Sequence, residues 1–158
     1  MRTRTKPQIQ AHRARSRVLI VDDDADGLQA LGVLFRRAGL SVSLAGSARE
    51  AARSVEQFRP NVLISDLAMP EEDGFALLRR VRKLERGLGR RSLAVAISAF
   101  SDPEMRGRAA AEGFEAYFVK PIDAEVVLSR LAQLGFEGKL GGGSGRGGSP
   151  ALFSRSER

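Results

Sequence analysis

The 158-residue sequence predicts an α/β protein in which a five-stranded parallel sheet carries helices on both of its faces. Between Val18 and Phe136, short apolar runs alternate five times with amphipathic stretches whose apolar residues recur at helical spacing. The apolar runs show little alternation between polar and apolar residues, which is typical of strands buried on both faces. Strands that alternate with helices are joined by right-handed crossovers, and such crossovers give a parallel sheet.

Five apolar runs predict the strands. They are VLIV from Val18, SVSLA near Leu44, VLIS before Asp66, LAVAI before Ser98 and YFV before Lys120. Every run except SVSLA is followed directly by a polar or charged residue. Because the carboxyl ends of parallel strands lie along one edge of a sheet, where ligands of open α/β sheets bind, we expect carboxylates, a hydroxyl and an amine to meet in one crevice.

The stretches between the strands carry apolar stripes wide enough to cover one face of a sheet. Ser47 with Glu50 three positions later predicts a capping box, and Asp102 and Asp123 predict the caps of the last two helices. Residues 85–92 (ERGLGRRS) predict a basic, glycine-containing loop before the fourth strand. The stripe expected for the first helix consists of Leu28, Leu31, Leu34, Phe35 and Ala38.

Composition divides the chain into a basic flexible arm over residues 1–16, one folded domain over residues 17–136 and a glycine-rich disordered tail over residues 137–158. Residues 1–17 carry six lysines and arginines and no acid, so the formal charge of +7 arises at the ends of the chain. No aromatic residues accompany these arginines as stacking platforms, so we expect no specific nucleic-acid binding. Because this tail is rich in glycine, no folded DNA-binding output domain is expected in it.

The composition also excludes several classes of protein. The chain has no cysteine, which excludes disulfides and thiolate metal sites. It has no apolar run of about 18 residues, so membrane insertion is not expected. Its first residues lack the apolar segment of a secretory signal. These observations together indicate a cytoplasmic location.

Oxygen ligands dominate the expected crevice. Asp22, Asp23 and Asp24 leave the first strand, and Asp66 ends the middle one. Helix capping explains one or two of these aspartates but not the whole cluster. Crowded carboxylates repel one another, and since no histidine or cysteine accompanies them, Mg²⁺ or a similar hard cation suits the site.

Two further residues suit a phosphoryl group. Lys120, just before Pro121, supplies a compact positive charge that pairs with carboxylate and with phosphate. The hydroxyl of Ser98 can donate a hydrogen bond to a phosphoryl oxygen. Capping or a surface turn explains each residue singly, but their joint position at the strand ends favours the functional interpretation.

The sequence resembles the receiver domain of two-component response regulators and is similar to the chemotaxis regulator. The matching segments, all within residues 17–136, are VLIVDDDADG, VLISDLAMPEEDGFALLRRVR, VAISAFSD and AAEGFEAYFVKPI. The resemblance implies a flavodoxin-like (βα)5 doubly wound fold with strand order 2-1-3-4-5. It also implies a cis peptide bond between Lys120 and Pro121.

The resemblance further implies a role for each site residue. Asp66 is the expected phosphoacceptor, with Asp22 and Asp23 as an acidic pair. Mg²⁺ is the expected cofactor. Asp23, Asp66 and the backbone carbonyl of Ala68 are expected to bind it directly, and Asp22 more often through a water molecule.

Three other residues are expected to bind or respond to the phosphoryl group. Lys120 is the expected phosphate-binding lysine and Ser98 the switch hydroxyl. Tyr117 is the expected aromatic switch, able to rotate inward once Ser98 moves.

A signalling phosphoacceptor is expected rather than an enzyme, since the domain catalyses only its own phosphorylation and dephosphorylation. The expected phosphodonor is a histidine kinase or a histidine phosphotransfer protein. A downstream protein is expected to bind the face made by the fourth helix, fifth strand and fifth helix, and a homodimer is compatible with the resemblance. The resemblance fits both a stand-alone regulator and the receiver end of a hybrid kinase.

Two alternatives stay open. One is a degenerate receiver that acts as a binding scaffold independently of phosphorylation. The other is a phosphohydrolase with an aspartate nucleophile, in which Asp22 and Asp24 would form an Asp-x-Asp pair. Lys120 and Pro121 fit receivers better than they fit such a hydrolase.

Overall fold

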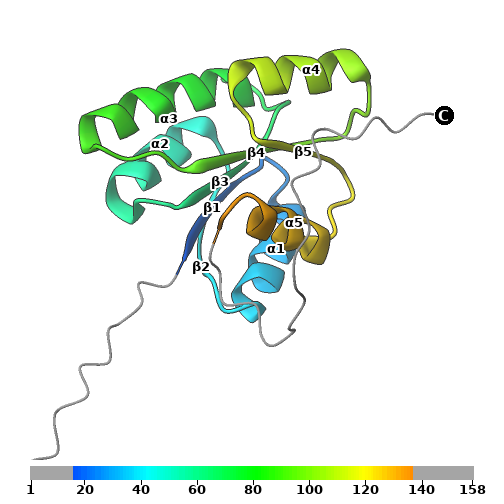
Figure 1. Cartoon of the computed structure of the whole chain (residues 1–158), viewed down its shortest axis with the longest axis horizontal. Coiled ribbons are helices and arrows are strands. Elements are labelled where there is room, and N and C mark those ends of the chain that lie inside the picture. The colour runs from blue at the N-terminus through cyan, green and yellow to red at the C-terminus, as the bar shows by residue number, and fades with distance from the viewer. Residues whose placement is uncertain (1–15, 137–158) are drawn as a thin grey trace, which may run out of the picture.

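The computed structural model describes residues 16–136, in which five strands alternate with five helices (Figure 1). The expected basic arm, apart from Ser16, and the expected glycine-rich tail lie outside the described residues. No helix in the described part of the chain is both long and apolar enough to cross a membrane. The strands are β1 (Arg17–Val21), β2 (Ser41–Ala45), β3 (Val62–Asp66), β4 (Leu93–Ser98) and β5 (Ala116–Val119). The helices are α1 (Ala25–Arg37), α2 (Ala48–Phe58), α3 (Gly74–Leu88), α4 (Pro103–Glu112) and α5 (Ala124–Gln133).

The five strands form one parallel sheet with the order β2-β1-β3-β4-β5, which confirms the expected flavodoxin-like fold. In the register of the sheet, Val21 of β1 pairs with Ser65 of β3, and Asp66 pairs with Ile97 of β4. Helices α1 and α5 cover one face of the sheet, and α2, α3 and α4 cover the other (Figure 1). This register aligns the carboxyl ends of β1, β3 and β4.

Two hydrophobic cores lie on the two faces of the sheet. Alternate residues of a strand belong to different cores: in β1, Leu19 and Val21 pack toward α2 and α3, whereas Val18 and Ile20 pack toward α1 and α5. All four side chains are fully buried. Burial on both faces explains why these strands appear as continuous apolar runs in the sequence.

The helix caps expected from the sequence are present. The Ser47 hydroxyl accepts the Glu50 N–H, while the Glu50 carboxylate accepts the N–H of Gly46 rather than that of Ser47. Asp102 caps α4 through the Met105 N–H at 2.7 Å, and Asp123 caps α5. These side chains satisfy backbone donors that a helix start leaves free.

The predicted apolar stripe of α1 was wrong at one position. Leu34 is 44% exposed, whereas Leu31, Gly32 and Phe35 are buried. Leu34 lies about 100° around the helix from Phe35, because an α-helix has about 3.6 residues per turn. The buried face therefore includes Gly32, which packs against the side chain of Leu44, in place of Leu34.

The loop predicted for residues 85–92 was wrong over its first half, because α3 continues to Leu88. Glu85 is a buried helical residue, and its carboxylate accepts hydrogen bonds from Arg82 at 2.8 Å and from the Ser92 N–H at 2.9 Å. Arg82 also donates to the Ser92 carbonyl at 2.7 Å. Arg82 and Glu85 lie three positions apart on α3, and both side chains bind Ser92, so this charged pair holds the end of the helix to the segment before β4.

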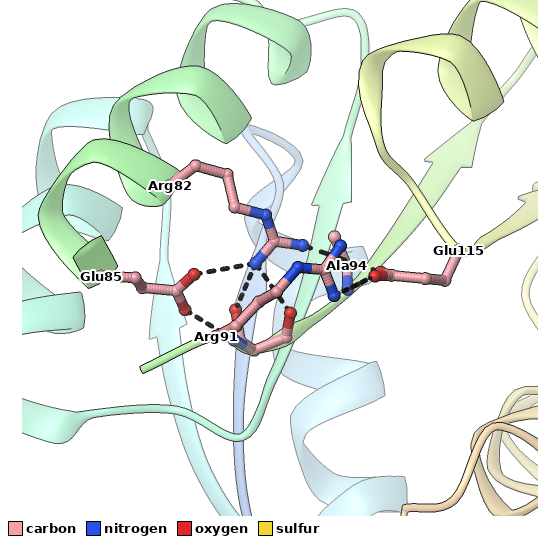
Figure 2. A network of polar contacts seen from close by, with 6 residues as sticks. Arg82, Glu85, Arg91, Ala94 and Glu115 are labelled. Atoms are coloured by element: carbon pink, nitrogen blue, oxygen red, sulfur yellow. Dashed lines mark hydrogen bonds and ion pairs between the residues drawn. The ribbon is translucent and has the colours of Figure 1, made fainter. Parts of the chain in front are cut away.

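This pair extends into the network shown in Figure 2. Glu115, just before β5, accepts a hydrogen bond from the Ala94 N–H and forms an ion pair with Arg91 at 2.6 Å. Arg82 approaches the same carboxylate at 3.7 Å. The network joins the end of α3 to the starts of β4 and β5, at the edge of the sheet opposite the strand carboxyl ends.

Candidate functional site

The strand carboxyl ends bring four of the expected site residues to one edge of the sheet. Asp22 directly follows β1, Asp66 and Ser98 are the last residues of β3 and β4, and Lys120 directly follows β5. The strands β1, β3 and β4 are neighbours, so the first three residues lie at adjacent strand ends. Asp22, Asp66 and Ser98 are buried.

Three carboxylates form a cluster that can hold a metal ion. Asp22, Asp23 and Asp66 each offer one carboxylate oxygen, and these oxygens lie within 4.8 Å of one another. Asp23 is exposed, so the cluster opens to solvent on its side. Asp24 lies outside the cluster and occupies the cap position of α1, where its N–H donates to Asp22 at 3.0 Å. The geometry therefore groups the first two aspartates of the run with Asp66.

Lys120 lies between the two buried carboxylates. Its ammonium nitrogen is 2.8 Å from an oxygen of Asp22 and 2.8 Å from an oxygen of Asp66. The peptide bond to Pro121 is cis, as predicted. The Lys120 N–H donates to the Ser98 carbonyl at 2.8 Å, which fixes the start of this segment against β4.

The positive charge of Lys120 does not fully balance the negative charges of the carboxylates around it. Burial is the largest influence on Asp66 and raises the pKa of its carboxyl above 3.8; the hydrogen bond and charge of Lys120 oppose this rise, and the charge of Asp22 adds to it. Burial lowers the pKa of Lys120, but its hydrogen bonds and ion pairs with Asp22 and Asp66 outweigh burial and raise that pKa above 10.5. Because one ammonium serves two buried carboxylates, the site has excess negative charge.

The donors present fit Mg²⁺. All three candidate side-chain ligands are carboxylates, and hard divalent cations prefer oxygen ligands. A cation would also relieve the excess negative charge around Asp66. Ala68 adjoins the cluster, because its N–H donates to an Asp66 oxygen at 3.1 Å. Coordination by the Ala68 carbonyl stays a prediction.

Ser98 and Tyr117 are connected through one residue, Phe100. The Ser98 hydroxyl accepts the Phe100 N–H at 3.1 Å, and the Tyr117 hydroxyl donates to the Phe100 carbonyl at 2.6 Å. The tyrosine side chain already points inward, since Tyr117 is only 8% exposed. The inward rotation expected after phosphorylation is therefore already made in this structure.

Sequence reasoning missed the structural importance of Gly74, the first residue of α3. A Cβ atom at this position would lie 2.3 Å from the carbonyl oxygen of Asp66 and 2.9 Å from the Cα of Leu67. The backbone of α3 therefore packs directly against the backbone that carries Asp66. The signal in the sequence was the Asp73-Gly74 pair at the helix start, because only glycine allows so close an approach.

Known proteins share this architecture. Residues 18–132 match the family described as "Response regulator receiver domain". Chemotaxis protein CheY4 of Vibrio cholerae is similar in structure, with a TM-score of 0.69 and 29% sequence identity over 76% of this chain and 98% of that chain.

Relatives in sequence agree with the family match. A protein described as an uncharacterized 14.6 kDa protein in the sodA1 3′ region of Leptolyngbya boryana is 40% identical over 120 residues, which is 76% of this chain and 89% of that protein. Transcriptional regulatory protein PrrA of Mycobacterium tuberculosis is 31% identical over 118 residues, 75% of this chain and 49% of the regulator. The chain thus spans about half the length of that regulator. By its sequence, its sheet order and its family match, this chain belongs to the response regulator receiver domains.

Proposed function

We propose that Asp66 accepts a phosphoryl group and that the protein passes a signal on through the face formed by α4, β5 and α5. The observation that carries this proposal is the position of Asp66, a buried carboxylate bonded to Lys120 and clustered with Asp22 and Asp23. Membership in the receiver family supports the same role. The protein acts as a signalling phosphoacceptor that promotes only its own phosphorylation and dephosphorylation.

The proposed reaction transfers a phosphoryl group from a phosphohistidine. A carboxylate oxygen of Asp66 attacks the phosphorus, a P–O bond forms as the P–N bond breaks, and the electron pair returns to the imidazole nitrogen. Lys120 lies 2.8 Å from the attacking carboxylate of Asp66 and can neutralise charge on the transferred group. Ser98 can donate its hydroxyl hydrogen to a phosphoryl oxygen while it still accepts the N–H of Phe100.

Mg²⁺ is the proposed cofactor. Asp22, Asp23, Asp66 and the Ala68 carbonyl would hold it, and when bound it supplies positive charge that offsets the charge of the phosphoryl oxygens. The proposed partners are a histidine kinase or histidine phosphotransfer protein as donor and a downstream protein as target.

Acetyl phosphate provides a direct test. The full chain should gain the mass of one phosphoryl group on incubation with acetyl phosphate and Mg²⁺, and Asp66→Asn should gain none. Omission of Mg²⁺ should strongly slow the reaction. A wild-type chain that gains no mass would favour a scaffold that works without phosphorylation, and steady hydrolysis of small phosphate esters would favour the phosphohydrolase.

Because Asp24 lies outside the carboxylate cluster, the Asp22 and Asp24 pair required by the hydrolase has little support.

A further inference from the structure

The side chain of Tyr117 is held from two sides. Its hydroxyl donates to the Phe100 carbonyl at 2.6 Å. The guanidinium carbon of Arg106, on α4, lies 4.7 Å from the centre of the tyrosine ring. Arg106 thus adds a cation–π contact to the hydrogen bond, and the ring is confined between the β4–α4 loop and helix α4.

These contacts form a continuous path from the phosphoacceptor edge to α4. Both backbone polar groups of Phe100 are used, its N–H by Ser98 and its carbonyl by Tyr117. Ser98 ends β4 directly beside the end of β3, where Asp66 lies. A change in the orientation of Tyr117 therefore alters the Phe100 backbone, and with it the hydrogen bond that orients the Ser98 hydroxyl.

We propose that Arg106 is a positioning residue that holds Tyr117 in its buried orientation and thereby keeps Ser98 oriented for a phosphoryl group. The link to phosphorylation rests on the proposed function, whereas the contact between Arg106 and Tyr117 does not. A cation–π contact changes the ratio of buried to released tyrosine by about two- to fivefold. Since coupling between two sites is reciprocal, loss of Arg106 weakens the binding of a phosphoryl group by up to the same factor.

The composition of the chain allows Tyr117 to be followed by fluorescence. Tyr117 is the only tyrosine of the sequence, which has no tryptophan, so the intrinsic fluorescence reports on this ring. Arg106→Met keeps a long side chain and removes the charge, and Arg106→Lys restores the charge. Arg108→Met is a matched control, because Arg108 is on the same helix and stacks at 3.9 Å on Phe75 instead.

The first measurement is acrylamide quenching of the full chain in metal-free buffer, with far-UV circular dichroism to verify folding. The ratio of protected to accessible Tyr117 should fall about two- to fivefold in Arg106→Met, recover in part in Arg106→Lys and stay at the wild-type value in Arg108→Met. Equal quenching of Arg106→Met and wild type overturns the positioning role. Equal losses in Arg106→Met and Arg108→Met also overturn it, because they indicate a general loosening of α4.

The second measurement titrates beryllofluoride, a phosphoryl mimic, in the presence of Mg²⁺. Arg106→Met should need more beryllofluoride for half-maximal protection of Tyr117, by up to about two- to fivefold, while Arg108→Met matches wild type. An unchanged midpoint in Arg106→Met overturns the coupling to the phosphoacceptor site. If wild type binds no beryllofluoride, the proposed function fails and the coupling with it, while the quenching result still decides the role of Arg106 toward Tyr117.

Discussion

The pKa of the Asp66 carboxyl is set by effects that act in opposite directions. Burial and the nearby Asp22 disfavour its ionised form, and Lys120 favours it. A buried carboxylate beside a second carboxylate contributes little to the free energy of folding, so folding alone does not explain its presence. The expected consequence is that the wild-type site lowers the stability of the protein.

Asp66→Asn should therefore raise the free energy of unfolding in metal-free buffer at neutral pH. Folding raises the pKa of Asp66 above 3.8, so the ionised form is less favourable in the folded protein than in the unfolded chain. The resulting loss of stability is absent below pH 3.8, develops as the pH rises through the raised pKa and is complete above it. The gain from Asn should grow over the same interval.

Urea unfolding at a series of pH values measures this gain. Asp123→Asn serves as a control, because Asn caps a helix about as well as Asp and Asp123 lies outside the carboxylate cluster. A lower stability of Asp66→Asn at every pH would contradict the prediction.

The aspartyl phosphate should be long-lived, for a reason that concerns two residues beside the site. Hydrolysis requires a water held in line with the phosphorus. Ala68 has no polar side chain, and Phe100 is apolar and 53% exposed beside Ser98. Ala68→Asn and Phe100→Glu should both shorten the lifetime severalfold, whereas Phe100→Leu should leave it unchanged. Loss of phosphoryl mass with time measures the decay, and equal rates in wild type and both polar variants would refute the argument.

At the scale of elements, the network around Arg82 fixes the end of α3 against two strands. Glu85→Ala should lower the free energy of unfolding by about 1–3 kcal/mol, because it leaves the buried Ser92 N–H without its acceptor and the half-buried Arg82 without its nearest carboxylate. Arg79→Ala is the matched control on the same helix. Its ion pair with Glu112 is exposed, so the loss should stay below about 1 kcal/mol. Urea unfolding measures both changes. Similar losses of unfolding free energy in the two variants would show that the network stabilises the protein no more than an exposed ion pair does.

The close contact between the start of α3 and the end of β3 leads to a second prediction about the elements. Gly74→Ala should destabilise the protein by about 1–3 kcal/mol, because the added Cβ meets backbone atoms that cannot move aside. It should also slow phosphorylation by acetyl phosphate, since the backbone at Asp66 must shift. Gly107→Ala is the control. Apart from its chain neighbours and the backbone of its own helix, no atom lies within 4 Å of a Cβ placed there, and in the interior of α4 alanine should stabilise by about 0.5–1 kcal/mol. A neutral Gly74→Ala would contradict the close packing.

At the scale of the whole molecule, the carboxylate cluster exists only in the folded chain, because Asp22 and Asp23 are remote from Asp66 in the sequence. Mg²⁺ should therefore stabilise the protein by about 2.7 kcal/mol at a hundredfold excess over its dissociation constant. Asp23→Asn should weaken this effect, and Asp26→Asn, outside the cluster, should retain it. Thermal unfolding over a series of Mg²⁺ concentrations at constant ionic strength measures both. No rise in the wild-type Tm would argue against a metal site.

The sequence by itself determined the alternation of strands and helices, the main helix caps and the set of polar residues at the strand ends. These features are local: a strand buried on both faces must be apolar throughout, and a cap requires a specific side chain next to the helix start. The order of the strands followed from the family resemblance, and the sheet confirmed it.

Only the tertiary structure decided which surfaces are buried and which distant groups meet. The face of α1 that excludes Leu34 depends on its packing against β2, and the helical position of Glu85 depends on Arg82 and Ser92. The contact of Arg106 with Tyr117 joins an element on the helical layer to the edge strand of the sheet. Such contacts depend on how separate elements pack together or on which apolar face of a helix is buried, and no local pattern of sequence encodes that choice.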